Sequence, residues 1–375
     1  MRVSDPPALA GHRGTRKHIS QKYHGSLMSL YMDAGYLHVT DPKDRVYGML
    51  GIATDCGPDH DILVDYTLSL SEVYGQVFEH FIRAYDNLSF LCCTAFKHAE
   101  VEEMGGHCTW LPHPQARGSS FDLFVHTKGA GGAISVASSS TIQLALDLGT
   151  SANTLGPSVF TLTARGILVD RVERTGVHEA LHLAPIDDWY ADLESLITEL
   201  PNSDDKITTE SVLVGYMRRV KELDREEDRD SSKASIRSFY DLYARTLQRS
   251  GKGRTKGTVA DMAVNENARL DSSPAFKDTV SHFLTCFAYT QFVKTQRGRL
   301  GIATSGHLEP GSEIWVVFGC PVLLVLHPTD GGRHSLRGQV WLDGLMDGEA
   351  CERVDMSGVP TADYEGPEVV DLVLC

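Results

Sequence analysis

Apolar residues recur at helical spacing in the first hundred residues of the chain. Val73, Val77 and Phe81 fall on one face of a helix. Ser69 and Glu72, just before this run, have the spacing of a capping box, in which the two side chains satisfy free N–H groups at a helix start. This segment is therefore predicted to be an amphipathic helix whose apolar face is packed in a core.

Two shorter helices are expected before it. Residues 26–36 place several apolar side chains on one face. Further along, Asp41 is suited to cap a helix that has Pro42 at its first position, where the missing N–H costs nothing. Asp44 favours the positive end of the same helix dipole, and Gly51 is expected to end this helix.

The pattern changes in the middle of the chain. Residues 105–160 are rich in Gly, Ser and Thr, which predicts loops and short strands. The alternating, β-branched stretch 159–169 predicts a pair of strands. Residues 186–295 return to helical spacing, and four helices are expected there: 187–198, 210–223, 235–249 and 275–294.

From Arg299 onward the apolar runs are short and are separated by Gly, Pro and Asp. This spacing predicts an antiparallel β-meander or a small, partly closed barrel. The predicted strands lie at residues 299–303, 313–318, 321–327 and 335–343.

The expected fold class is α+β, with mainly helical N-terminal and central parts and a C-terminal antiparallel β-meander or small barrel. A length of 375 residues suits two or three packing units. The predicted organisation is a flexible tail (1–24), a helical region (25–104), a Ser/Gly-rich β-containing region (105–185), a second helical region (186–297), a β-meander (298–352) and a second tail (353–375).

Charge and hydropathy narrow the expected location and partners. The formal net charge is −15, which repels nucleic-acid phosphates and anionic lipids. The basic stretch 249–256 has no aromatic residue to stack on bases and is expected to be a solvated loop. The N-terminus lacks an apolar signal region, and the longest apolar run, 314–326, is broken by Gly and Pro. A cytoplasmic protein is expected, with its eight cysteines reduced and with neither nucleic acid nor membrane as a partner.

One local pattern is typical of a zinc hydrolase. His178, Glu179 and His182 form an H-E-x-x-H sequence, in which two histidines one helical turn apart grip zinc and the glutamate activates a water. Gly176 and Pro185 leave barely two helical turns for it, and no third ligand stands out. A zinc-dependent hydrolase is therefore kept as an alternative, and a pair of loop-proximal histidines is the preferred interpretation.

Other candidate motifs are weaker. His107, Cys108 and His113 lack the four-ligand spacing of a structural zinc site. The glycine-rich stretch 128–132 lacks the G-K-[ST] ending of a phosphate loop. No catalytic, cofactor-binding or metal-binding residues are assigned, and no cofactor is expected.

Two long stretches resemble one protein family. They are LMSLYMDAGYLHVTDPKDRVYGMLGIA (27–53) and the region 298–350, which includes RLGIATSGHLEPGSEIWVVFGCPVLLVLHP and GLMDGEA. Together they resemble the fungal heterokaryon incompatibility (HET domain) proteins, in the region that follows the HET core. Shorter matching segments lie at 62–66, 72–74 and 162–170.

The chain departs from the family pattern at several positions. Ser312 and Glu313 stand where the family has an aspartate after glycine, and His327 replaces the arginine of an L-R-P sequence. The family's tryptophan-rich stretch is reduced to the sequence at 109–112. The family's L-S-Y-x-W-G and I-D-x-x-C-I-N-Q core segments do not occur, so the chain is expected to correspond to the portion downstream of the core.

The resemblance implies a role in fungal non-self recognition and programmed cell death, as a recognition, scaffold or regulatory portion that binds a protein partner without catalysis. A further alternative is part of a TIR-like nucleotide-processing signalling protein whose active core lies outside this chain. The family-motif residues, whose role the sequence leaves open, are Asp41, Pro42, Asp44, Arg45, Tyr47, Gly344, Asp347, Gly348 and Glu349.

Overall fold

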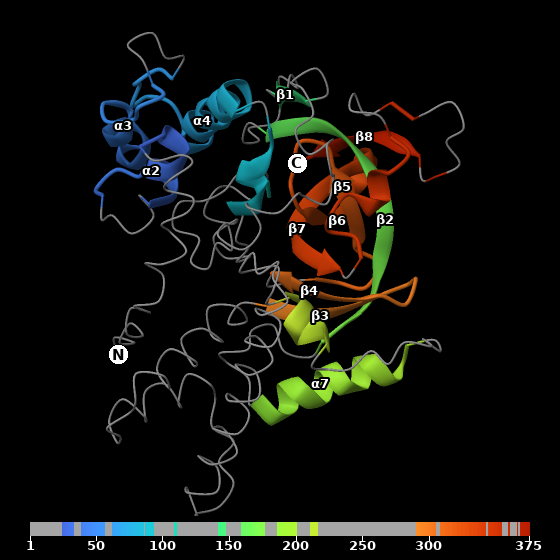
Figure 1. The fold of residues 1–375 in the computed structure, drawn as a ribbon. Helices are drawn as coiled ribbons and strands as arrows, with labels where there is room; N and C mark the ends of the chain where they lie inside the picture. Colours follow the sequence, from blue (N-terminus) through green and yellow to red (C-terminus); the bar gives the residue numbers. More distant parts are fainter. Residues whose placement is uncertain are drawn as a thin grey trace, which may run out of the picture.

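The computed structural model of the chain contains a group of helices beside a curved β-sheet, with a further helix at the far end of that sheet (Figure 1). It describes residues 25–33, 39–56, 62–85, 87–93, 109–110, 142–147, 159–176, 186–200, 211–216, 290–304, 308–342, 344–354, 359–360, 366 and 368–375. We call residues 25–33, 39–56 and 62–85 the helical unit.

The helical unit contains α2 (Leu27–Asp33), α3 (Asp44–Leu50) and α4 (Leu70–Tyr85). Its centre is aromatic: the ring of Tyr31 meets those of Tyr74 and Phe78 edge-on, each at 5.8 Å between centroids. The capping box at the start of α4 is confirmed, because the Glu72 carboxylate accepts the Ser69 N–H at 2.7 Å and the Ser69 hydroxyl accepts the Glu72 N–H at 3.3 Å.

The helix predicted after Asp41 begins later than expected. α3 starts at Asp44, and residues 42–43 form a turn before it. The Asp41 carboxylate still accepts a free backbone N–H, that of Lys43, at 2.9 Å. Asp41 therefore closes the turn that leads into the helix instead of capping the helix itself.

The strands form one sheet that closes on itself. They are β1 (Ile142–Asp147), β2 (Val159–Thr175), β3 (Thr290–Thr295), β4 (Leu300–Thr304), β5 (Glu313–Val317), β6 (Leu323–Thr329), β7 (Arg333–Leu342) and β8 (Val369–Leu374). The order is β1-β2-β3-β4-β7-β6-β5, and β5 also pairs with β2, which closes a ring that we call the barrel. β5, β6 and β7 form the predicted meander, whereas β4 lies between β3 and β7.

β2 is a single strand, not the predicted pair of strands. Its first half pairs with β1 and β8, and its second half pairs with β5 and β3. Gly166 lies where β5 and β8 both meet the strand, and a Cβ placed there would be 2.7 Å from the Val316 carbonyl oxygen. The glycine therefore permits a close approach of two backbones and does not mark a turn.

Two predictions for the second half of the chain are wrong. The helix expected at 275–294 ends in a strand, because β3 covers Thr290–Thr295 and is buried along its whole length. The predicted tail after residue 353 contains β8, which pairs with β2 in antiparallel register. β8 is a short, mostly apolar run and β3 has only Phe292 and Val293 as apolar residues, so hydrophobic spacing alone does not distinguish strand from helix in either segment.

The expected helix at 187–198 is confirmed as α7 (Ile186–Thr198), which lies beside β3 and β4 (Figure 1). Residues 211–216 are helical, and the ring of Tyr216 meets that of Trp341 on β7 at 5.9 Å. The predicted helix at 235–249 lies outside the described residues.

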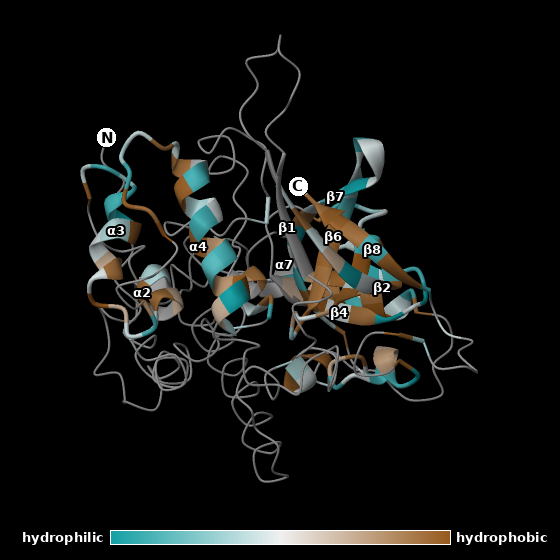
Figure 2. Ribbon diagram, turned by 90° about the horizontal axis from the view of Figure 1, so that it is seen from above, coloured by the Kyte–Doolittle hydropathy of each residue, from teal (hydrophilic) through white to brown (hydrophobic). Residues whose placement is uncertain are grey.

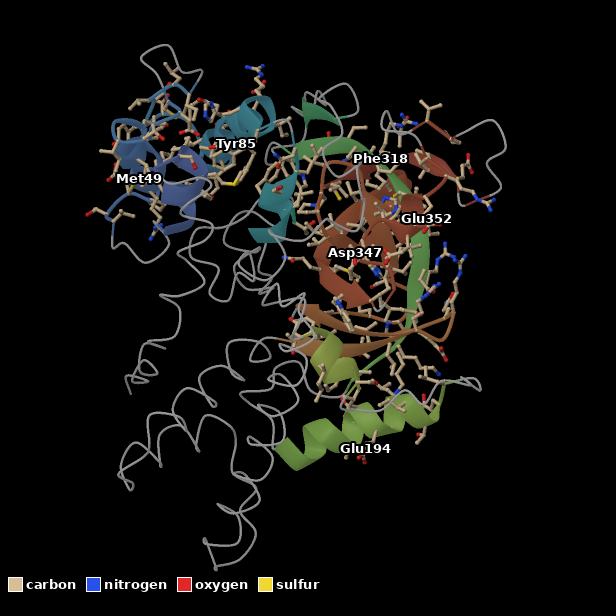
Figure 3. The ribbon with its side chains drawn as sticks, in the orientation of Figure 1. Met49, Tyr85, Glu194, Phe318, Asp347 and Glu352 are labelled. Carbon is tan, nitrogen blue, oxygen red and sulfur yellow. The ribbon has the colours of Figure 1, made fainter. Side chains whose placement is uncertain are left out.

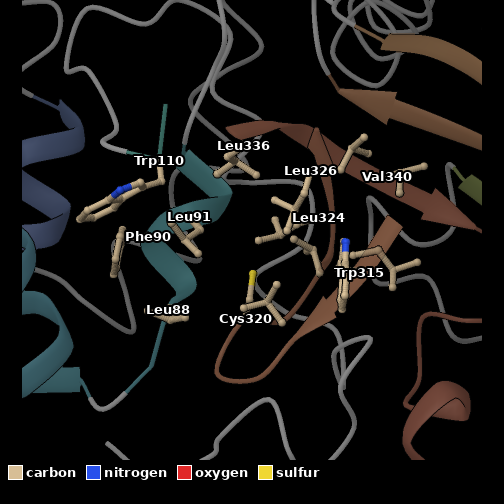
Figure 4. Close-up of a cluster of buried hydrophobic side chains, with 14 of the residues drawn as sticks. Leu88, Phe90, Leu91, Trp110, Trp315, Cys320, Leu324, Leu326, Leu336 and Val340 are labelled. Atoms are coloured by element: carbon tan, nitrogen blue, oxygen red, sulfur yellow. The ribbon is translucent and has the colours of Figure 1, made fainter. Parts of the chain in front are cut away.

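Apolar side chains connect the helical unit to the barrel (Figure 4). The 3-10 helix η2 (Ser89–Cys93) lies between them, and the Leu88 N–H donates to the Gly319 carbonyl at 2.7 Å. Trp110 is fully buried against the rings of Phe78 and Phe90, at 6.3 and 6.4 Å between centroids. Figure 2 shows the barrel strands as mostly hydrophobic and α4 as mixed, as expected for a buried sheet and an amphipathic helix.

Candidate functional site

The residues of the sequence-predicted zinc motif, His178, Glu179 and His182, lie outside the described part of the chain. The same holds for the weaker cluster of His107, Cys108 and His113. The family-motif residues are described, and they fall into two groups. One group surrounds α3 in the helical unit and the other follows β7 on the barrel, near the labels Met49 and Asp347 in Figure 3.

The first group of motif residues holds the segment 62–66 against α3 through hydrogen bonds and a ring contact. The Tyr47 hydroxyl donates to the Asp65 carbonyl at 2.8 Å, and the Asp44 carboxylate accepts the Tyr66 hydroxyl at 2.6 Å. The rings of Tyr47 and Tyr66 also meet edge-on at 5.1 Å. Arg45 points into the unit and is only 4% exposed. These motif residues are therefore structural supports for the segment that they hold.

The segment and the end of α3 expose large apolar side chains. Ile62 is buried, but Leu63, Val64 and Tyr66 are 62%, 54% and 53% exposed, and Ile52 is 63% exposed. The segment runs antiparallel to α3, since Tyr66 meets Asp44 at the helix start and Asp65 meets Tyr47 one turn later. Leu63 and Val64 precede these residues, and the Leu63 N–H donates to the Gln76 side chain of α4 at 2.8 Å, whereas Ile52 follows the end of α3 by two residues. We call Ile52, Leu63, Val64 and Tyr66 the apolar patch.

The border of the apolar patch is mainly acidic. Asp41, Asp44 and Asp65 lie along it, and Lys43 donates to the Tyr66 carbonyl at 2.9 Å. Hydrogen bonds from the hydroxyl and the backbone N–H of Thr67 lower the pKa of the Asp65 carboxyl, which keeps it charged. The patch thus combines exposed apolar surface with a negative rim.

The second group of motif residues forms a turn after β7. Gly344 and Gly348 have φ values of 73° and 98°, a left-handed backbone conformation that favours glycine. The Glu349 carboxylate accepts the Asp347 N–H at 2.7 Å and closes the turn. These contacts are local and do not create a site.

A polar cluster on the barrel surrounds Glu313. One carboxylate oxygen accepts from Arg171 at 2.8 Å, and the other accepts from Trp315 at 3.1 Å and lies 3.3 Å from Nε2 of His334. The Glu313 side chain is 11% exposed, and both of its oxygens are occupied. The cluster links β2, β5 and β7 through both oxygens of Glu313.

Ser312, His327 and Glu309 are arranged like a nucleophile, a base and an orienting acid. The Ser312 hydroxyl lies 3.4 Å from Nδ1 of His327, whose Nε2 lies 3.9 Å from the Glu309 carboxylate. However, Ser312 is completely buried, so its hydroxyl does not reach a substrate. Two of the departures from the family pattern, Ser312 and His327, therefore contact each other and serve packing.

A third cluster joins residues that are far apart in sequence. Asp55 and Cys56 follow α3, and His80 lies on α4; their ligand atoms all lie within 4.8 Å of one another. The Cys56 sulfur is 3.7 Å from Nε2 of His80. Burial and the Asp55 carboxylate raise the pKa of the Cys56 thiol to about 11. Sequence reasoning missed this cluster because 24 residues separate the cysteine from the histidine and no motif links them.

Comparison of the chain with family models, curated proteins and solved structures gave no match. No helix in the described part of the chain is long and apolar enough to cross a membrane. The resemblance to the HET domain proteins therefore depends on the quoted sequence motifs alone.

Proposed function

We propose that the chain is the recognition or regulatory portion of a fungal non-self recognition system, which acts in the cytoplasm through protein binding. The resemblance of residues 27–53 and 298–350 to the HET domain family supports this role. In this role the chain contributes to a programmed cell death response without catalysing a reaction.

The observation that carries the proposal is the apolar patch. Two of the motif residues around α3, Asp44 and Tyr47, hold the segment that exposes Leu63, Val64 and Tyr66, and Ile52 belongs to the motif stretch itself. Large apolar side chains that share one exposed region are typical of protein interaction sites. A purely structural role would explain why motif residues hold this segment against α3. It would not explain why the large apolar side chains of the segment are exposed.

The charge around the patch defines the expected partner. Three carboxylates and one ammonium group border it, and the whole chain has a net charge of −15. The partner is therefore a polypeptide that presents an apolar stripe bordered by Lys or Arg. The first partner to test is a HET core polypeptide, since the family places that core directly before the motif that forms the patch.

Binding of the purified chain to a purified HET core polypeptide, measured by calorimetry, tests the proposal. Leu63→Glu places a charge in the patch and is expected to weaken binding at least tenfold, about 1.4 kcal/mol. Val359→Glu is the matched control, because Val359 is 48% exposed but lies outside the patch. Binding that both variants retain equally would contradict a role for the patch.

A further inference from the structure

We propose that Asp55, Cys56 and His80 bind a zinc ion in the helical unit. The three side chains offer a carboxylate oxygen, a thiolate sulfur and an imidazole nitrogen, and all three are partly buried. This site is separate from the H-E-x-x-H sequence at 178–182 and does not depend on the proposed function.

The geometry suits a tetrahedral ion. Zinc binds cysteine sulfur at about 2.3 Å and histidine nitrogen at about 2.0–2.1 Å, so tetrahedral angles place the two ligand atoms about 3.6 Å apart. The Cys56 sulfur and Nε2 of His80 are 3.7 Å apart. The separation of these two atoms therefore matches that of two zinc ligands, and the ligand atom of Asp55 lies within 4.8 Å of both.

The Asp55 carboxylate is held in place by groups outside the cluster. Its Oδ1 accepts the Leu27 N–H at 2.7 Å, and its Oδ2 accepts the Tyr85 hydroxyl. Each oxygen keeps a second lone pair for a metal. Proteins commonly orient metal-binding carboxylates with such hydrogen bonds.

The backbone around the ligands is also anchored. The Thr54 N–H donates to the Gly25 carbonyl at 2.7 Å, which ties the stretch before Asp55 to the start of α2. His80 lies within α4, on the same helix as Tyr85. Asp55 and Cys56 thus lie in a turn whose start is tied to α2, and His80 lies within a helix, which reduces the entropy lost on binding.

The alternative chemistry for a cysteine, a histidine and an aspartate is nucleophilic catalysis. A reactive cysteine needs a thiol whose pKa is lowered by its surroundings. Burial and the Asp55 carboxylate have the opposite effect on Cys56.

The mixture of ligands favours zinc over other common ions. Calcium and magnesium prefer oxygen ligands alone, whereas zinc accepts sulfur, nitrogen and oxygen together. Three protein ligands leave a fourth tetrahedral position for a water molecule or another side chain.

Cobalt substitution in the full chain tests the site. Protein stripped with a chelator is titrated with Co²⁺, and we expect one ion per chain with the sulfur-to-cobalt charge-transfer absorption of a thiolate ligand. Cys56→Ser should abolish that absorption, and His80→Gln should weaken binding at least tenfold. Cys375→Ser is the matched control, because Cys375 is another partly exposed free cysteine, and it should change nothing.

Wild-type protein without the charge-transfer absorption would overturn the proposal, and this result needs no variant to fold. Absorption that persists in Cys56→Ser would also overturn it. Cobalt binding that is lost on His178→Ala but retained in His80→Gln would assign the metal to the H-E-x-x-H sequence instead. None of these outcomes bears on partner binding through the apolar patch, so the two proposals fail separately.

Discussion

At the residue scale, individual side chains decide how closely the elements approach each other. Asp41, Ser69 and Glu72 act on neighbouring backbone, so their hydrogen bonds were predictable from spacing along the sequence. The contact of Cys56 with His80 was not, because it depends on how α3 and α4 pack together. The need for glycine at position 166 was not predictable either, because it arises from the close approach of β5 to β2 in the folded sheet.

Gly166→Ala is expected to destabilise the protein by about 1–3 kcal/mol, because the new Cβ would overlap the Val316 carbonyl oxygen. Gly48→Ala is the matched control: it lies on an exposed face of α3 with nothing within 4 Å of the added carbon. Alanine there should stabilise the helix by about 0.5–1 kcal/mol. Urea denaturation measures both changes, and equal effects of the two substitutions would contradict the close approach at Gly166.

At the element scale, the amphipathic helix and the C-terminal strands were predictable, because each has a repeated spacing over enough residues. β3 and β8 were not predictable: β8 is a mostly apolar six-residue run that fits a strand and a helix equally well, and β3 has only two apolar residues, Phe292 and Val293. The order of the strands also escaped prediction. β2 pairs with β5, which lies far along the sequence, and only the folded barrel brings those residues into register.

Two adjacent substitutions in β8 test whether this segment is a strand of the barrel. Leu372 is 1% exposed, and Leu372→Ala should cost about 2–5 kcal/mol of unfolding free energy. Asp371 points outward and lies 4.0 Å from Arg165, so Asp371→Ala should change stability by less than about 0.5 kcal/mol. If neither substitution matters, residues 369–374 are a tail as the sequence first suggested.

At the scale of the whole molecule, the helical unit and the barrel share one continuous apolar core. The sequence predicted helical and strand-rich regions but not how they join. Thr109 and Trp110 form much of the joint: the Thr109 hydroxyl accepts the Leu336 N–H at 2.8 Å, and Trp110 packs on α4. These two residues thus connect both parts.

Trp110→Ala should cost about 3–5 kcal/mol, because it empties a fully buried site between the two parts. Because Trp110 connects the helical unit to the barrel, thermal unfolding of the variant should show two transitions where the wild type shows one. Calorimetry with circular dichroism at helix- and strand-sensitive wavelengths distinguishes the transitions. A single transition at the wild-type temperature would show that the joint does not couple the parts.

The central claim is that the chain acts by binding through its apolar patch. The most direct measurement is the fraction of fusion cells that die when a fungal strain expresses wild-type protein, Leu63→Glu or Val359→Glu at matched levels. The account predicts that Leu63→Glu loses the death response while Val359→Glu retains it. Death that persists with Leu63→Glu but disappears with His178→Ala would contradict the account and favour metal-dependent chemistry at residues 178–182.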